Sequence, residues 1–198
     1  AISVPNIFME RMLARENFTL FDPHEILAVK GYALEDYFDT EDEKEFTKRY
    51  IECEQDPNLH GIQVPALDMK KIMRSAVETG TPFIFFRDTV NAANPNKHAG
   101  MIYASNLCHE IAQNVGFTNL AEEIINEDGT ITTKTNTGDM VTCNLNSISL
   151  GRITDEELEE NIALQIRMLD NVISINQAPV PESRMTSDKY RAIGLGTS

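Results

Sequence analysis

Apolar side chains recur every three to four residues through much of the first eighty positions, a period typical of helices that pack by one face. Capping residues and prolines mark where these helices begin, and Gly80 marks an end. The predicted helices cover residues 3–15, a segment that starts at Asp22-Pro23, residues 40–54 and residues 65–80, with residues 18–21 extended. The apolar faces expected on the last two are Phe46, Tyr50 and Ile51, and Leu67, Ile72, Met73, Ala76 and Val77.

The pattern changes after residue 80. A continuous apolar run at residues 82–86 predicts a buried strand, and the residues from 91 to 100 are rich in Asn, Pro and Gly, which predicts a loop. Residues 101–111 and 140–150 are predicted to be extended. Glu127-Asp-Gly129 predicts the turn of a hairpin.

Thr154 and Glu157 have the spacing of a capping box, which predicts a long helix that ends near Ile175. Residues 178–183 are expected to be a turn-rich connector. Helices that alternate with strands indicate an α/β fold. The apolar stripe expected along the long helix is Leu158, Ile162, Ile166, Leu169 and Ile173.

Composition narrows the class of protein. The 198 residues suffice for one domain, and their net charge of −14 argues against a nucleic-acid-binding surface. We interpret the acidic run at residues 41–45 as a solvated helix face rather than a site for a basic partner. Three cysteines without framework spacing fit a reducing compartment, and no apolar run approaches a membrane span. The sequence thus predicts a cytoplasmic protein that contacts neither nucleic acid nor membrane.

The candidate chemistry lies in residues 104–111. On an extended backbone, side chains alternate between two faces. One face would place a thiol between an amide and a carboxylate, which is unusual for an ordinary strand. A lone strand cysteine such as Cys143 is, by contrast, typical of a small buried hydrophobe. The two expected faces of the segment are Asn106, Cys108 and Glu110 on one side and Leu107, His109 and Ile111 on the other.

Longer stretches around this segment carry a family resemblance. Pro82-Phe-Ile-Phe-Phe-Arg-Asp-Thr-Val-Asn91, Asn94-Pro-Asn-Lys-His-Ala-Gly-Met-Ile-Tyr103 and Ser105-Asn-Leu-Cys-His-Glu-Ile111 resemble the active-site region of the large (α) subunit of class I ribonucleotide reductase. Further similar stretches are residues 4–11, 18–23, 138–145, 150–152, 165–172 and 191–197.

The resemblance implies a fold and a domain organisation. The family's catalytic domain is a ten-stranded α/β barrel made of two antiparallel halves, with the radical cysteine on a central finger loop. Residues 1–198 would form a single partial catalytic-barrel domain. Within it, residues 1–80 would be mainly helical, residues 81–151 would hold strands and the active-site loop, and residues 152–198 would form a long helix and a connector.

The resemblance also implies residue roles. Cys108 matches the cysteine that becomes a thiyl radical and takes the 3′ hydrogen of the ribose. Glu110 matches the carboxylate that accepts the 3′-hydroxyl proton, and Asn106 matches the amide that binds the ribose hydroxyls. Leu107 belongs with them to the substrate-binding segment. Cys143 matches one of two cysteines that supply electrons and close into a disulfide in each turnover.

Partners follow from the class. Coenzyme-B12-dependent reductases usually carry Asn-Pro-Cys-Gly-Glu, whereas this chain has Asn-Leu-Cys-His-Glu, as in class I. The implied substrate is a ribonucleoside diphosphate, reduced for DNA precursor synthesis. No metal or cofactor would bind directly, because a metal-containing small (β) subunit supplies the radical and a thioredoxin- or glutaredoxin-type dithiol restores the cysteines. The large subunit would be a homodimer. Its remaining segments would hold the effector site, the phosphate-binding loop and the second reducing cysteine, so this chain is expected to be a fragment or split piece.

Other functions stay open. The chain could be a non-catalytic piece that completes a barrel, or part of a coenzyme-B12-dependent reductase. A cysteine hydrolase would need His24, His60 or His98 beside Cys108. A metal site could be drawn from Cys108, His109, Cys143 and His98, but no ligand spacing supports it. Because His109 is expected on the face opposite Cys108, we predict a packed or hydrogen-bonded histidine rather than a base.

Overall fold

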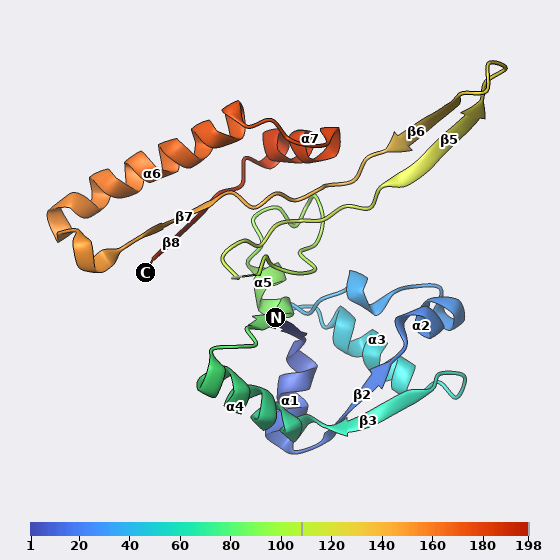
Figure 1. The fold of residues 1–198 in the computed structure, drawn as a ribbon. Coiled ribbons are helices and arrows are strands. Elements are labelled where there is room, and N and C mark those ends of the chain that lie inside the picture. The colour runs from blue at the N-terminus through green and yellow to red at the C-terminus, as the bar shows by residue number, and fades with distance from the viewer. Residues whose placement is uncertain (108, 198) are drawn as a thin grey trace. The chain divides into compact units, whose positions relative to one another are not determined.

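The computed structural model describes residues 1–107 and 109–197 of a mixed α/β chain (Figure 1). The chain divides into two compact units, Ala1–His109 and Glu110–Ser198, which we call the N-terminal and C-terminal units. The described residues form four two-stranded sheets and no closed barrel, so the ten-stranded arrangement stays a prediction. None of the described helices is long and apolar enough to cross a membrane.

The N-terminal unit is mainly helical, and two short strand pairs complete it. β1 pairs with β4 in parallel, and β2 pairs with β3 in antiparallel fashion. The strands are β1 (Ile2–Val4), β2 (Asn17–Phe21), β3 (Gly61–Pro65) and β4 (Ile84–Phe86). The helices are α1 (Asn6–Ala14), α2 (Pro23–Lys30), α3 (Glu45–Glu54), α4 (Met69–Thr79) and α5 (Arg87–Ala92), with short 3-10 turns η1 (Leu34–Asp36) and η2 (Ala66–Asp68).

Tyr50 of α3 lies at the centre of the core of this unit. Its ring stacks on Phe18 at 4.8 Å and on Phe46 at 5.9 Å between centroids. Its hydroxyl accepts from the backbone N–H of Thr19 (2.6 Å) and donates to the carbonyl of Thr19 (2.9 Å). Burial raises the pKa of Tyr50 to about 12. The other buried members of this core are Ile7, Ile26, Leu34, Cys53, Leu59 and Ala66.

Local capping signals located some helix ends correctly. Asp22 accepts from the backbone N–H of His24 (2.8 Å) at the start of α2, as predicted. Gly80 ends α4 with a φ of 76°, which a residue without Cβ adopts at little cost. The prediction that a helix begins at Ser3 is wrong, because residues 2–4 pair with β4 and α1 begins only at Asn6.

The predicted starts of the third and fourth helices are wrong, and so is the predicted burial of part of their apolar faces. Thr40 accepts from the backbone N–H of Glu43 (2.9 Å), but this contact closes a turn, and α3 begins at Glu45. Similarly, α4 begins at Met69 because the chain first forms β3 and η2. Three apolar residues assigned to buried faces are exposed, because only one edge of each helix meets the core: Ile51 (37%), Met73 (47%) and Val77 (83%).

The strand predicted at residues 82–86 is shorter and less buried than expected. β4 contains three residues and, among the described strands, pairs with β1 alone. Phe85 is buried, whereas Phe83 and Phe86 are 42% and 44% exposed. The chain then enters α5 directly, so Asn91 is helical rather than the start of a loop.

The C-terminal unit combines a long helix with a parallel strand pair and a projecting hairpin (Figure 1). The capping box of Thr154 and Glu157 is present at the start of α6, and Gly129 (φ 84°) lies in the hairpin turn, both as predicted. Leu169 and Ile173 are buried, but Ile166 is 43% exposed. The elements are β5 (Asn119–Ile125), β6 (Ile131–Asn136), β7 (Leu145–Ile148), η3 (Leu150–Arg152), α6 (Asp155–Ile175), α7 (Pro181–Tyr190) and β8 (Gly194–Thr197).

Two predictions for this unit are wrong, and one strand was not predicted. Residues 140–144 are irregular, and the extended run is confined to β7. The expected connector at residues 178–183 gives way to α7 at Pro181, which occupies the first helical position that suits proline. The last residues form β8, which the sequence pattern did not indicate because its Gly-Leu-Gly-Thr sequence has little strand propensity.

Candidate active-site segments

The segment that precedes Cys108 in the sequence is held by a side chain rather than by a strand. Asn91 of α5 is fully buried, and its amide donates to the carbonyl of Ile102 (2.8 Å) and accepts from the N–H of the same residue (2.8 Å). The amide thereby replaces a neighbouring strand for that residue. This explains why the predicted strand at residues 101–111 is wrong: the described residues there are irregular apart from an isolated bridge.

Two adjacent buried residues of α5, Arg87 and Asp88, connect this helix to the rest of the N-terminal unit. Asp88 accepts from the backbone N–H of Asn6 (2.6 Å), and its carboxylate lies 3.7 Å from the guanidinium of Arg87. Arg87 in turn covers the ring of Phe46 at 4.1 Å. Burial lowers the pKa of Arg87 and raises that of Asp88. The charge of each residue partly offsets the effect of burial on the pKa of the other. The helix that presents Asn91 is therefore anchored to the aromatic core.

Two of the predicted site residues follow in the same unit. Asn106 is half-buried, and its carbonyl accepts from Ser105 Oγ (3.0 Å) and from the N–H of His109 (3.3 Å). Leu107 is 85% exposed, so it does not pack into the N-terminal unit. Cys108 lies outside the described residues.

His109 is packed between aromatic rings, which confirms the expectation of a packed histidine. Its ring centroid lies 5.7 Å from that of Phe83 in a stacked arrangement and 5.4 Å from that of Phe85 in an edge arrangement. Its backbone has a φ of 73°, in the left-handed region, which ends the regular alternation of faces expected for an extended chain. Among the described residues, none hydrogen-bonds its buried Nε2.

Glu110 belongs to the C-terminal unit and lies beside the start of β8. A Cβ at Gly194 would be 3.1 Å from Ile111 Cδ1 and 3.6 Å from Glu110 Cγ. The N–H of Gly194 donates to the carbonyl of Asn144 (2.9 Å), directly before β7. Glycine at this position thus allows the Glu110 segment to approach the end of the strand pair.

Cys143 lies in the irregular segment before β7, and its side chain is exposed. The interpretation as a buried strand thiol is therefore wrong. Both of its neighbours are held: Thr142 Oγ1 lies 2.8 Å from Ser187 Oγ of α7, and the carbonyl of Thr142 accepts from Gln113 Nε2 (3.3 Å). Asn144 Nδ2 donates to the carbonyl of Leu169 in α6 (2.8 Å).

The structure therefore brings Glu110 and Cys143 to the same end of the β7–β8 pair, while Asn106 and Leu107 belong to the N-terminal unit. Sequence reasoning missed the amides that hold the two segments, Asn91, Gln113 and Asn144. An amide residue within an apolar stretch could have indicated such a role. Amide residues are also common in turns, however, so the pattern does not distinguish the two.

The alternative sites gain little from the described residues. Residues 1–107 and 109–197 contain no group of three or more His, Cys, Asp or Glu side chains that could hold a metal ion. His60, a candidate base for a hydrolase, lies 2.6 Å from Glu25 and is largely exposed. Cys53 is buried beside the hydroxyl of Tyr32 (3.8 Å), and burial raises its pKa.

Comparison with known proteins identifies the class. The family described as "ribonucleotide reductase, barrel domain" matches residues 1–198, so the chain belongs to this family. A ribonucleoside-diphosphate reductase subunit alpha of Treponema pallidum is 44% identical over 209 residues, which include the whole chain and 24% of that protein.

Two other relatives carry the same name. The subunit alpha of Helicobacter pylori (strain J99) is 34% identical, with 99% of this chain and 29% of that protein aligned. The protein of Synechocystis sp. is 33% identical, with 98% of this chain and 23% of that protein aligned. The chain thus spans about a quarter of the length of these relatives.

Proposed function

We propose that this chain supplies the radical-cysteine segment and one reducing cysteine of a class I ribonucleoside-diphosphate reductase. The observation that carries the proposal is the family match over residues 1–198, together with the Asn106-Leu-Cys-His-Glu110 sequence. The chain would form part of the family's ten-stranded barrel, with Cys108 on its finger loop, in a cytoplasmic and homodimeric large subunit.

In this proposal each residue has one chemical task. The Cys108 thiyl radical takes the 3′ hydrogen of a ribonucleoside diphosphate, while Glu110 accepts the 3′-hydroxyl proton and Asn106 orients the ribose. The 2′-hydroxyl leaves as water. Cys143 and a second thiol of the large subunit supply two electrons and two protons and become a disulfide. Cys108 then returns its hydrogen to C3′, which gives the 2′-deoxy product and regenerates the radical.

The surroundings of Cys143 suit a thiol that is oxidised and restored in each cycle. Its side chain is exposed, and an external dithiol must reach one sulfur of a disulfide in order to reduce it. Contacts from Gln113, Ser187 and Asn144 fix the backbone on either side of it. Glu110 approaches the same end of the β7–β8 pair, as expected for two residues that act on one substrate.

The radical would come from a partner. The relatives are named as alpha subunits, and in class I a metal-containing small (β) subunit generates the radical. A thioredoxin- or glutaredoxin-type protein would reduce the disulfide that contains Cys143. The remaining segments of the large subunit would complete the substrate site.

The test is a reconstitution assay. This chain is combined with the remaining segments of its large subunit, the small subunit and a dithiol reductant, and conversion of a ribonucleoside diphosphate to its deoxy form is measured. Cys108→Ser should abolish turnover. The control is Cys53→Ala, which removes a cysteine thiol from the core of the N-terminal unit. This variant should retain turnover. Cys143→Ser should stop formation of the deoxy product while substrate is still consumed, because hydrogen abstraction precedes reduction.

Two results would contradict the proposal. Turnover that survives Cys108→Ser would exclude this cysteine as the radical carrier. Turnover that requires added coenzyme B12 instead of the small subunit would assign the protein to the other class. If no combination is active while the chain still assembles with its partner segments, a barrel-completing role is favoured.

A further inference from the structure

We propose that His109 is a positioning residue for Cys108, and that it acts through the two aromatic rings that hold its imidazole. The inference rests on the proposed function of Cys108. It concerns a residue for which the family resemblance gives no role, and the three side chains that carry it all belong to the N-terminal unit.

The rings that contact His109 belong to β4 and to the residue just before it. Phe85 is buried in β4, where it lies opposite Ser3 of β1. The carbonyl of Phe83 accepts from the N–H of Ile2 (2.8 Å), which extends the same pair by one hydrogen bond. His109 contacts one face of this pair through both rings, at centroid distances of 5.7 Å and 5.4 Å. Aromatic pairs in this range are attractive beyond the area that they bury.

The backbone of His109 lies in the left-handed region, with a φ of 73°. Few residues that carry a Cβ adopt this conformation, although histidine does so more often than most. The N–H of His109 donates to the carbonyl of Asn106 (3.3 Å), while no described residue hydrogen-bonds its buried Nε2. Ring packing is therefore the main contact described for the imidazole.

The proposal requires that contacts which hold His109 also restrain its neighbour in sequence, Cys108. Cys108 is covalently joined to His109. The hydrogen bond from the N–H of His109 to the carbonyl of Asn106 connects the residues at positions 106 and 109. Hydrogen abstraction requires the sulfur within a narrow distance of the ribose C3′. A displacement of about 1 Å lowers the rate about 100-fold. Loss of the ring contacts should therefore slow the abstraction step more than it weakens substrate binding.

Three substitutions distinguish the contribution of the His109 ring from that of its backbone conformation. His109→Phe keeps an aromatic ring, His109→Asn keeps a residue that tolerates positive φ, and His109→Ala keeps neither. In the reconstituted reductase we expect His109→Phe to retain kcat within about threefold. We expect His109→Asn and His109→Ala to lower kcat about tenfold to 100-fold, with KM within about twofold. Phe83→Leu should have an effect of the same kind.

The decisive readout is the isotope effect on kcat with substrate deuterated at C3′. If His109 positions the thiol, abstraction becomes rate-limiting in His109→Ala and the isotope effect rises. A merely structural role would lower the amount of active enzyme and leave the isotope effect unchanged. An unchanged isotope effect, or an Asn variant that outperforms the Phe variant, would overturn the inference. If the Ala variant does not fold, the Phe and Asn variants decide between these outcomes.

The failure of this inference can be distinguished from failure of the proposed function. If Cys108→Ser retains turnover, the proposed function is wrong and the positioning role is lost with it. If Cys108→Ser is inactive while His109→Ala has a wild-type kcat and isotope effect, only the positioning role is overturned.

Discussion

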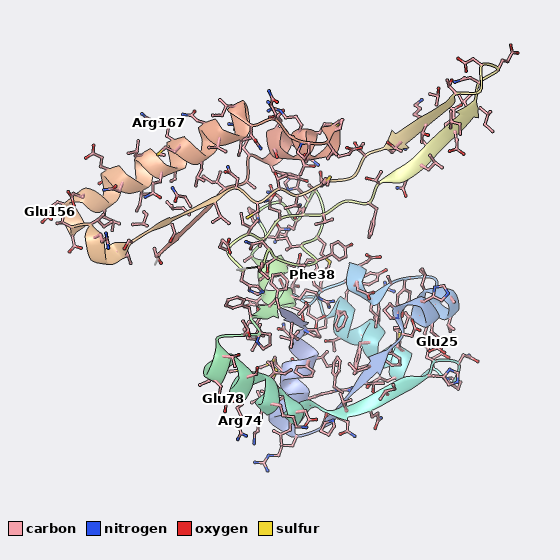
Figure 2. All side chains as sticks on the ribbon, viewed as in Figure 1. Glu25, Phe38, Arg74, Glu78, Glu156 and Arg167 are labelled. Carbon is pink, nitrogen blue, oxygen red and sulfur yellow. The ribbon has the colours of Figure 1, made fainter. Side chains whose placement is uncertain are left out.

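The two units of the chain are stabilised in different ways. The N-terminal unit has an aromatic core, with Phe18, Phe46 and Tyr50 in contact, and Figure 2 shows side chains gathered between α1, α3 and β2. In the C-terminal unit the described buried apolar side chains are few. They are Ile111, Ile148, Leu169 and Ile173. Both strands of its hairpin are exposed along their whole length.

Polar side chains bonded to backbone groups hold the C-terminal unit together. Arg191 donates to the carboxylate of Asp170 (2.6 Å) and to its carbonyl (2.7 Å), and Asn144 reaches the carbonyl of Leu169. Arg184 bonds to the carbonyls of Ile173 (3.3 Å) and Asn176 (3.1 Å). Such contacts are directional, so they fix the position of a segment without the broad stabilisation of a large core.

The difference has consequences for the proposed chemistry. Asn106 and His109 belong to the N-terminal unit with its aromatic core, whereas Glu110 and Cys143 belong to the C-terminal unit, which polar contacts hold together. A redox cysteine must remain accessible, and a segment held by a few hydrogen bonds allows this. A radical position requires a fixed geometry, which packing between rings supplies.

The largest effect that follows from this comparison is on the aromatic core. Phe18→Ala should lower the free energy of unfolding by about 3–5 kcal/mol, because it leaves a cavity beside Phe8 and Tyr50. Urea unfolding followed by circular dichroism and tyrosine fluorescence would measure it, since the chain has no Trp. The control is Leu120→Ala in the hairpin, where the side chain is 62% exposed and the change should stay within about 0.5 kcal/mol. Equal effects would contradict the contrast between the units.

Local sequence signals predicted some elements well. Asp22-Pro23 begins α2, Thr154 and Glu157 begin α6, and Gly129 marks the hairpin turn, because each signal acts between residues close in sequence. The parallel pairs could not be predicted in this way. β1 and β4 contain three residues each, and their pairing joins residues about eighty positions apart, so neither has enough length to show a period.

The candidate site shows the same division. Packing of His109 was predicted, but through an alternation of faces that the segment does not have. The strand expected at residues 101–111 is replaced by backbone contacts to Asn91, and no periodicity reveals that an amide will take the place of a strand. The roles of Asn106, Cys108, Glu110 and Cys143 came from the family resemblance and stay predictions.

An intermediate effect on stability is expected from the side-chain amide of Asn144 in the C-terminal unit. Asn144→Ala removes the bond to the Leu169 carbonyl and should cost about 0.5–1.5 kcal/mol, the usual net contribution of one hydrogen bond. Hydrogen exchange by mass spectrometry should show faster exchange in residues 140–146 while the N-terminal unit is unchanged. Asn146→Ala is the matched control, since the Asn146 side chain accepts only from the adjacent Ser147 N–H (2.8 Å) among the contacts described for it. Similar exchange in both variants would mean that other contacts fix the segment.

The smallest effect concerns a carboxylate at the edge of the aromatic core. Burial alone would raise the pKa of Glu54, but hydrogen bonds from Arg11 and Thr19 lower it below its usual value of 4.5. Because the folded pKa is depressed, Glu54 contributes stability above pH 4.5, and this contribution is lost as the pH falls through the folded pKa. Glu54→Gln should therefore cost less than about 1 kcal/mol at pH 7 and still less at pH 3.5.

Urea unfolding of the wild type and of Glu54→Gln at both pH values would measure this difference. Glu10→Gln is a suitable control, because Glu10 forms an exposed ion pair with Lys44 (3.2 Å) and its loss should change stability little. If Glu54→Gln destabilises the chain equally at pH 7 and pH 3.5, the ionised carboxylate is not what the Arg11 contact stabilises. The charge of Glu54 would then contribute little to stability at this edge of the aromatic core.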